Sequence, residues 1–478
     1  MQNNQSIKIG KRTFFSSLAL LGGLMLIAGI LGRIIPAGEF SRHVSDGREL
    51  ILPGSFEFME APNYPVWRWF TAPFEVLWGP DSTMIISIIL FILVIGGSFT
   101  ILNEAGVLSQ GINRIVAFAG KRKYLLLALV SLFFMLFGSM LGIFEEVVAL
   151  VPLAIALAWS LGWDSLTGLG CSLLAIAFGF STAIANPFSV GVAQRIAGLP
   201  PFSGAAFRAL GFLLVYMVLL IFLILHARKV ENHPEKSPVY KEDLAAKAAR
   251  SAESREPLSK SNASLVFFSL SIVALFALII AASLIPGLSD LTMPFVAVVF
   301  LVSGFGSGLL AGLGKKVFKA FGRGIIGILP GIILIMMAMS VKFIISKSGV
   351  MDSVLYYASM AISKTSASGA ALLSYALVLG LNFFIGSATA KAFLVMPLLS
   401  PLADLAGITR QTAVLAFAFG DGFSNVLYPT NPVLLIALGL TVVSYAKWFR
   451  WVIKLQLAIL VLTALLLLGA VAIKLGPF

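Results

Sequence analysis

The sequence predicts an all-α polytopic membrane protein with two inverted repeats, about nine spans, two re-entrant hairpins and two broken helices. Of its 478 residues, 59% are hydrophobic and only 12% are charged, which is too apolar for a soluble globular protein. Two apolar runs are interrupted by the same polar pair, Asn186-Pro187 and Asn431-Pro432. The repeat is indicated by spacing, because Pro152 to Pro187 and Pro397 to Pro432 are both 35 residues.

The apolar segments divide the chain into five parts. These are a first span with an external loop (1–80), a first repeat (81–226), a cytoplasmic linker (227–262), scaffold spans (263–323) and a second repeat (324–478). Full spans are predicted at 14–35, 82–103, 204–226, 263–285, 293–313, 324–345 and 450–475, and surface helices at 106–120 and 350–363. Each repeat adds a hairpin and a broken helix, at 124–161 and 166–198 in the first, and at 367–405 and 409–443 in the second.

Charge sets the predicted orientation. The net charge of +13 lies largely in short loops and the linker, where positive-inside bias explains it, so nucleic acid is excluded as a partner. The basic residues of segment 1–12 place the N-terminus in the cytoplasm. Segment 124–161 fits either two full spans or one hairpin, and the hairpin is favoured because it keeps the basic linker inside. The aromatic segment 67–70 in the external loop is typical of an interfacial anchor.

The two Asn-Pro breaks are the predicted binding site. Proline lacks the N–H that the helix ladder needs, so each helix opens there and exposes half-helix ends. N-terminal ends suit a carboxylate, whereas carbonyls at C-terminal ends suit a cation. Neutral polar residues surround both breaks, and these side chains either bind a solute or satisfy the opened backbone. They are Ser181, Thr182, Asn186, Ser424, Asn425, Thr430 and Asn431, with Ser139, Ser387 and Thr389 at the hairpin turns.

Four charged residues lie at the hairpin turns or beside a break, deep in the predicted membrane region, where charge is costly and usually functional. Glu145 and Glu146 begin the second arm of the first hairpin, so we expect one to face the site and the other to cap the helix. Asp421 lies near the C-terminal end of its half-helix, where the dipole opposes an anion, so it is assigned to a cation or proton, with turn chemistry as the alternative. Lys391 needs a carboxylate partner, either one of these three residues or an anionic substrate, unless it snorkels to the surface.

The sequence contains no catalytic constellation, phosphate loop or metal-ligand spacing, so an enzyme is not expected and no cofactor is predicted. Na⁺ or H⁺ remains a candidate coupling ion, with Na⁺ nearest Ser181, Asn186, Asp421 and Asn425. The single cysteine, Cys171, excludes an internal disulfide and is interpreted as a small core residue.

Several motifs together resemble one family across nearly the whole chain. They are Ile35-Pro36-Ala37-Gly38-Glu39-Phe40, Pro53-Gly54-Ser55, Glu145-Glu146, Asn186-Pro187-Phe188, Gly191-Val192-Ala193-Gln194, Phe419-Gly420-Asp421-Gly422-Phe423-Ser424-Asn425 and Pro429-Thr430. These resemble the YfcC-like branch of the anaerobic C4-dicarboxylate carrier (DcuC) family of the ion transporter superfamily. The resemblance implies inverted repeats, a scaffold with a moving transport domain, a homodimer and the bacterial inner membrane. Substrates of relatives include dicarboxylates, short-chain fatty acids and arginine exchanged for ornithine.

Two departures from the family pattern concern the site. The second hairpin turn reads Ile385-Gly386-Ser387-Ala388-Thr389-Ala390-Lys391, with lysine where relatives carry glutamine. The second break reads Thr430-Asn431-Pro432, where relatives tend to have Thr-Ser-Gly. The added positive charge suggests that Lys391 replaces a coupling cation, which would make the protein independent of sodium.

These observations predict a secondary active transporter of small carboxylates or amino acids, ion-coupled or exchanging, that works by an elevator-like movement in the lipid bilayer. One alternative is an arginine/ornithine-type basic amino acid antiporter, favoured by two buried acids and disfavoured by Lys391. A channel is the alternative from another class, but it needs a continuous polar pore, whereas paired broken helices suit an occluded site.

Overall fold

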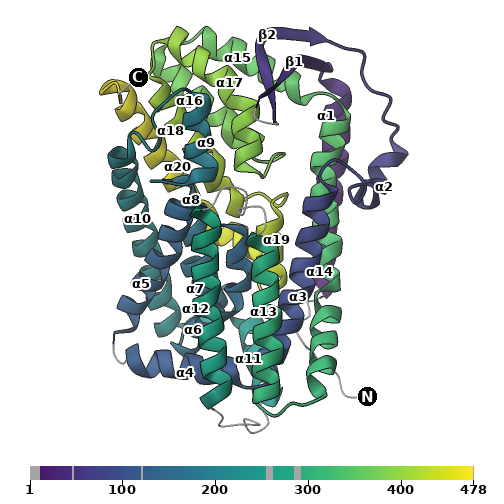
Figure 1. The fold of residues 1–478 in the computed structure, drawn as a ribbon, viewed down its shortest axis with the longest axis vertical. Coiled ribbons are helices and arrows are strands. Elements are labelled where there is room, and N and C mark those ends of the chain that lie inside the picture. Colours follow the sequence, from purple (N-terminus) through teal and green to yellow (C-terminus); the bar gives the residue numbers. More distant parts are fainter. Residues whose placement is uncertain (1–10, 46–47, 120–121, 254–261, 285–291, 477–478) are drawn as a thin grey trace.

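The computed structural model describes residues 11–476 except 46–47, 120–121, 254–261 and 285–291. Within these ranges, nine helices are long and apolar enough to cross a membrane. The helices run mainly along the long axis of the molecule (Figure 1). The prediction of a helical polytopic membrane protein is therefore confirmed, while the predicted inversion of the repeats stays a prediction. Residues 1–10, on which the predicted orientation partly depends, lie outside the described ranges.

The first part of the chain supplies a span, a β-hairpin and the first set of short helices. Its elements are α1 (Lys11–Ile34), β1 (Gly38–Ser45), β2 (Arg48–Phe58), α2 (Trp67–Glu75), α3 (Ser82–Glu104), α4 (Val107–Ala119), α5 (Lys123–Leu136), η1 (Phe137–Leu141), η2 (Glu145–Ala149), α6 (Val151–Ser160), α7 (Ser165–Leu169), η3 (Gly170–Leu174), α8 (Ala175–Ser181), η4 (Pro187–Gly191), α9 (Val192–Ile196) and α10 (Ala205–Asn232).

The second part contains the longest helices and another set of short ones. Its elements are η5 (Pro234–Lys236), α11 (Tyr240–Glu253), α12 (Asn262–Leu284), α13 (Thr292–Leu310), α14 (Lys316–Lys347), α15 (Met351–Ser363), α16 (Ala367–Leu381), α17 (Ala388–Ala406), α18 (Arg410–Gly422), η7 (Phe423–Val426), α19 (Pro432–Gly439) and α20 (Tyr445–Ala472).

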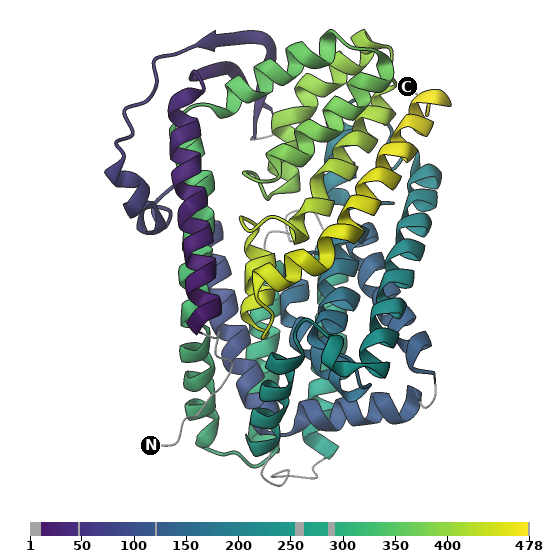
Figure 2. The ribbon, with the colours of Figure 1, turned by 180° about the vertical axis from the view of Figure 1, so that it is seen from behind.

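The helices form two groups that touch along a limited front. In one group α3 packs against α13 and α14, which in turn contact α12 and α1. The other group contains the hairpin arms and the segments around the two breaks, with α16, α17 and α18 in mutual contact and α5 against α8. The two views show α1, α3 and α14 together on one side, and α10 and α20 on the other (Figures 1 and 2). The groups meet where α19 packs against α14 and η2 against α13.

A two-stranded antiparallel sheet, β1–β2, was not expected from the proline-containing loop 36–80. Asp352 of α15 anchors it, because its carboxylate accepts hydrogen bonds from Phe40 N (3.0 Å) and from Arg42 Nη2 (2.7 Å). The ring of Phe56 also stacks on Tyr356, with centroids 4.2 Å apart. The strands were missed because their stability depends on α15, more than 300 positions away in sequence.

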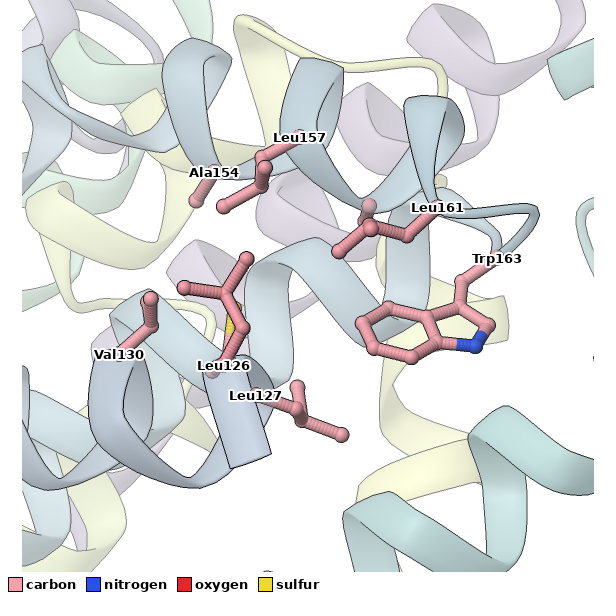
Figure 3. Close-up of a pocket in the computed structure, with 9 residues that line it drawn as sticks. Leu126, Leu127, Val130, Ala154, Leu157, Leu161 and Trp163 are labelled. Carbon is pink, nitrogen blue, oxygen red and sulfur yellow. The ribbon is translucent and has the colours of Figure 1, made fainter. Parts of the chain in front are cut away.

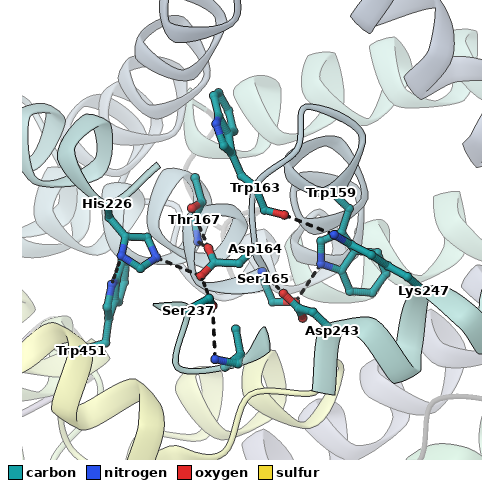
Figure 4. A network of polar contacts seen from close by, with 11 residues as sticks. Trp159, Trp163, Asp164, Ser165, Thr167, His226, Ser237, Asp243, Lys247 and Trp451 are labelled. Atoms are coloured by element: carbon teal, nitrogen blue, oxygen red, sulfur yellow. Dashed lines mark hydrogen bonds and ion pairs between the residues drawn. The ribbon is translucent and has the colours of Figure 1, made fainter. Parts of the chain in front are cut away.

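The helix α10 continues to Asn232, so the first residues of the predicted linker, which starts at residue 227, are helical. Helix-forming residues extend the helix past the apolar run, and Glu231 fixes the extension by pairing with Lys123 and accepting from Tyr124 OH at 2.5 Å. Two other spans also begin earlier than predicted, α14 at Lys316 and α20 at Tyr445. A buried polar network connects the linker to the helices beside it (Figure 4).

That network joins the loop before α7 to α10, α11 and α20. Asp164 accepts from Ser237 Oγ at 2.6 Å and contacts His226 Nε2 at 2.9 Å. Trp451 Nε1, which can only donate, lies 3.0 Å from His226 Nδ1, so the imidazole is neutral with its proton on Nε2. Asp243 of α11 accepts from Ser165 N and Oγ, at 2.8 and 2.5 Å. The linker is thus tied to the start of the first broken helix.

Cys171 is a buried free thiol, as the sequence suggested. Its Sγ donates to Gly168 O at 3.3 Å, and the side chain borders a small apolar cavity of about 10 Å³ near Leu126 and Trp163 (Figure 3). The residues around this space are almost all apolar, so the cysteine serves as a small packing residue.

Candidate substrate site

The first break lies between Ser181, where α8 ends, and Pro187, where η4 begins. Asn186 is the N-cap of η4, because its Oδ1 accepts from Phe188 N at 2.9 Å and from Ser189 N at 3.2 Å. Proline at the first helical position costs no hydrogen bond there, so Asn-Pro favours the start of a new helix. The preceding helix ends earlier, at Ser181.

The turn of the first hairpin closes over this break. Ser139 Oγ donates to Thr182 O at 2.8 Å and accepts from Ile184 N at 3.0 Å, while Ser139 O accepts from Ala185 N at 3.2 Å. Thr182 Oγ1 donates to Phe178 O at 2.8 Å. For Ser139 and Thr182 the structure therefore supports the simpler of the two interpretations, which is that they satisfy the opened backbone.

The second break has the same construction. α18 ends at Gly422, a short 3-10 segment follows, and α19 starts at Pro432 with Asn431 as its N-cap, whose Oδ1 accepts from Leu434 N at 3.3 Å. Asn431 Nδ2 donates to Asn425 Oδ1 at 3.1 Å. Thr430 Oγ1 donates a hydrogen bond to Phe383 O, a carbonyl of the second hairpin, at 2.6 Å.

Lys391 pairs with Asp421 between the second hairpin and the second break. Both side chains are buried, at 0% and 1% exposure. Of the three carboxylates considered as partners, the structure brings Asp421 to the lysine, and Lys391 Nζ also donates to Asn382 Oδ1. Asn382 Nδ2 donates in turn to Ser424 Oγ (2.7 Å) and Asn425 Oδ1 (2.9 Å). Asn382 was missed, although a lone amide in an apolar hairpin arm is a usable signal.

The two breaks meet each other. A Cβ on Gly422 would lie 2.3 Å from Ser181 Oγ, and the rings of Phe178 and Phe423 are 5.4 Å apart. The second hairpin reaches the first break, because Thr389 Oγ1 donates to Phe188 O at 3.0 Å. The interrupted segments, far apart in sequence, therefore form one buried site.

Arg208 was missed by the sequence analysis and is central to the first break. It is buried, and its guanidinium donates to Ala183 O (2.7 Å), Ile184 O (3.0 Å), Ser203 O (2.7 Å) and Phe202 O (3.3 Å). All of these acceptors are backbone carbonyls, and among the described residues Arg208 forms no ion pair. A basic residue in the apolar run 204–226 is the signal that could have identified it.

Glu145 and Glu146 begin the 3-10 helix η2, which packs against α13 and α19. Both are half-buried, and within the described chain neither forms an ion pair. Glu145 lies close enough to Asp421 for their charges to interact. The two glutamates therefore lie at the edge of the site without a cation partner among the described residues.

Ser387, in the turn of the second hairpin, caps α17, because its Oγ accepts a hydrogen bond from Ala390 N at 3.3 Å.

Several buried polar atoms at this junction have no hydrogen-bond partner in the part of the chain that the structure describes. They are Ser181 Oγ, Asn186 Nδ2, Ser189 Oγ and Asp421 Oδ2. Of the four residues assigned to Na⁺, only Ser181 and Asp421 keep a free oxygen, since Asn186 Oδ1 and Asn425 Oδ1 already accept hydrogen bonds. No group of three or more His, Cys, Asp or Glu side chains suited to a metal occurs among the described residues.

A multi-pass helical fold whose interrupted helices converge on buried polar groups defines a membrane transporter. The family model described as "C4-dicarboxylate anaerobic carrier" (DcuC) matches residues 14–472, so the chain belongs to this family. The resemblance inferred from the motifs is thereby confirmed. Membership shows a transporter of this type and leaves its own substrate to be proposed.

Two relatives extend over most of the chain. One, from Escherichia coli, carries the name "Putative basic amino acid antiporter YfcC" and is 28% identical over 490 aligned positions, covering 95% of this chain and 96% of its own. The other, from Haemophilus influenzae, is described as an uncharacterized protein and is 25% identical, covering 81% of this chain and 76% of its own.

Two solved transporters align over nearly the full length. The Alcanivorax borkumensis YdaH transporter is 16% identical with a TM-score of 0.43, covering 97% of this chain and 100% of its own. Neisseria gonorrhoeae MtrF, a member of a class of antimetabolite efflux pumps, is also 16% identical, with a TM-score of 0.42 and coverage of 95% of both chains.

Proposed function

We propose that this protein is a secondary active transporter of the bacterial inner membrane, with a cytoplasmic N-terminus, that carries small carboxylates or amino acids. One observation carries the proposal: Asn186 Nδ2 is a buried donor without a partner in the described chain, at the start of a half-helix. The positive end of a helix and an amide donor together bind a carboxylate. Family membership agrees with this solute class.

A second candidate, exchange of basic amino acids, is favoured by the pattern of charge. Lys391 counted against a cationic substrate, but its charge is paired with Asp421. Glu145 and Glu146 have no cation partner among the described residues and suit a substrate ammonium or guanidinium. The name of the Escherichia coli relative points the same way. A basic amino acid would place its carboxylate at Asn186 and its side chain toward the glutamates.

Lys391 also bears on coupling. Its ammonium occupies a position between two oxygens, Asp421 Oδ1 and Asn382 Oδ1, that would otherwise suit a bound cation. We therefore expect uptake into proteoliposomes without a sodium gradient, driven by exchange or by protons. A requirement for a sodium gradient with Lys391 in place would contradict this assignment.

The proposed movement is elevator-like, within a homodimer. The group of hairpins and breaks touches the scaffold group through α19 on α14 and η2 on α13, and a separate apolar cluster joins Leu435 of α19 to Leu334 of α14. A disulfide between Leu334→Cys and Leu435→Cys, in a Cys171→Ala background, should stop substrate exchange, and reduction of the disulfide should restore it. Undiminished exchange in the cross-linked protein would exclude sliding at this contact.

A ligand screen tests the substrate class. Purified protein is heated with dicarboxylates, short-chain fatty acids, or arginine, ornithine and lysine, and any ligand that raises the Tm is then tested for exchange in proteoliposomes. Stabilisation by basic amino acids alone selects the antiporter, and stabilisation by dicarboxylates or fatty acids selects a carboxylate carrier. Non-saturating conductance in a planar bilayer, with no ligand that raises the Tm, would indicate the channel and overturn the proposal.

A further inference from the structure

A second pocket lies far from the breaks, where the segment before α2 crosses the ends of α1 and α14. Its volume is about 350 Å³. Its lining residues come from these three segments: Gly29, Gly32, Arg33, Ala61, Pro62, Asn63, Tyr64, Trp69, Ile344 and Ser348. The volume suits a small head group, and nothing in the transport site accounts for it.

Arg33 supplies the only charge among these lining residues. Its guanidinium lies 5.5 Å from the ring centre of Trp69, and among the described residues it has no carboxylate partner. The nearby Arg68 differs, because both its Nε and its Nη2 bond the Glu75 carboxylate, the latter at 2.5 Å. Arg33 therefore keeps its guanidinium donors for an external anion, and a planar guanidinium matches a phosphate well.

The pocket walls are held by close packing rather than by loose loops. A Cβ on Gly29 would lie 2.4 Å from the Trp69 ring, and a Cβ on Gly32 would lie 2.6 Å from Ser348 Cβ. Tyr64 OH donates to Arg68 O at 3.2 Å, and burial and then Glu75 raise the pKa of Tyr64 to about 12. Because these contacts position the ring walls, the pocket is a built feature of the fold.

The surroundings place this pocket at a membrane–water boundary. One face of α2 and the turn after it present exposed aromatic rings, namely Trp67, Phe70, Phe74 and Trp78, the last 81% exposed. Aromatic residues of this kind concentrate at the interface. On α1, Ile30 and Ile34 are exposed beside Arg33, which provides an apolar surface for acyl chains. The views show α2 set against the side of α1 and α14 (Figures 1 and 2).

We propose that this pocket binds the head group of an anionic phospholipid, with the phosphodiester on Arg33 and the acyl chains along α1 and the α2 aromatic face. A phosphodiester carries one negative charge, which matches one unpaired arginine. A free phosphate at neutral pH carries more negative charge than the single arginine of this lining neutralises. It also has no apolar part that could contact the adjacent apolar surface. The bound lipid would fix the segment before α2 against α1 and α14.

The test is lipid titration of the purified full-length protein, followed by native mass spectrometry. Phosphatidylglycerol is the probe, with phosphatidylethanolamine and inorganic phosphate as the other arms. We expect one tightly held phosphatidylglycerol, and about tenfold weaker binding to Arg33→Gln, because a charge-assisted contact to phosphate is lost. Ala61→Trp, which fills the pocket and keeps Arg33, should weaken binding similarly.

Lys364→Gln is the matched control, because it removes an exposed cation away from the pocket. Unchanged phosphatidylglycerol binding in both pocket variants would overturn the proposal. Equal stabilisation by inorganic phosphate would replace the lipid with a free anion, and equal retention of phosphatidylethanolamine would remove the role of net charge. Thermal unfolding of each variant separates loss of the site from loss of the fold, and none of these residues contacts the transport site.

Discussion

Arg208 Nε donates a 2.7 Å hydrogen bond to Ala183 O, a carbonyl that the first helix break leaves without a helical partner. A second carbonyl of the same break, Ile184 O, accepts from Arg208 Nη2 at 3.0 Å. The second break is held differently, by Lys391 bound to Asp421 and Asn382. Each break therefore has its own resident cation, one bound to backbone carbonyls and the other to side-chain oxygens.

Replacing Arg208 should open the first break. Arg208→Met leaves the carbonyls of Ala183 and Ile184 buried and unpaired, so we expect a loss of about 2–4 kcal/mol in the free energy of unfolding. Arg208→Lys keeps the charge but not the planar guanidinium with its several donors, so its loss in the free energy of unfolding should be roughly half as large. Denaturant titration in detergent measures both. Arg323→Met, which removes a partly exposed pair with Glu104, should cost no more than about 1 kcal/mol, and equal effects in the two proteins would contradict the role of Arg208.

Removing Lys391 should be more harmful than removing the whole pair. Lys391→Met leaves the Asp421 carboxylate buried without a counter-charge, which should lower the free energy of unfolding by about 3–5 kcal/mol. Combining it with Asp421→Asn removes the orphaned charge and should recover much of that loss. Both proteins should lose transport. If the double variant is no more stable than Lys391→Met alone, the pair is not what stabilises this part of the site.

Asn186 combines a structural and a proposed binding role that two substitutions can separate. Asn186→Asp retains an acceptor for Phe188 N and Ser189 N but loses the free Nδ2 donor, so folding should persist while ligand-dependent stabilisation disappears. Asn186→Ala should lose ligand-dependent stabilisation too, and its free energy of unfolding should fall by about 1 kcal/mol, as expected for a lost N-cap. The control is Ser366→Ala, which removes the cap of α16 away from the site. An undiminished ligand-induced Tm shift in Asn186→Asp would remove this amide from the substrate site.

The start of the helix after each break could be predicted from the sequence, because Asn caps that helix and Pro occupies its first position by local chemistry alone. The ends of the preceding helices, at Ser181 and Gly422, lie before the Asn-Pro pairs and were not predicted in the same way. The partner of Lys391 could only be narrowed to three carboxylates, since the choice depends on how the second hairpin folds back onto α18. Arg208 and the β1–β2 sheet escaped prediction for the same reason. Their partners lie on distant elements, the carbonyls of the break and Asp352 of α15 respectively.

Contact between the two breaks can be tested at Gly422. A Cβ there would lie 2.3 Å from Ser181 Oγ and 3.0 Å from Ser181 N, so Gly422→Ala forces the two segments apart. We expect loss of transport and a destabilisation of about 1–3 kcal/mol, typical of overpacking. Gly386→Ala, in the turn of the second hairpin, meets nothing within 4 Å and should be tolerated. Normal exchange by Gly422→Ala would mean that the breaks need not touch during transport.

The docking of α11 should depend on pH through Asp243. Burial raises the pKa of Asp243 to about 6, although its hydrogen bonds from Ser165 oppose this shift. The docked helix therefore binds more protons than the undocked helix between pH 3.8 and about 6, and docking weakens as pH rises through this window. Burial has the largest single effect on Asp164 and opposes its ionisation, but the contacts with His226, Ser237 and Thr167 together outweigh burial and lower the pKa of Asp164 below 3.8, so Asp164 titrates outside the window. Between pH 5 and 7, hydrogen exchange corrected for intrinsic rates should show about a tenfold rise in the opening of α11. Asp243→Asn should abolish that rise, and a rise of the same size in this variant would assign the effect to another group.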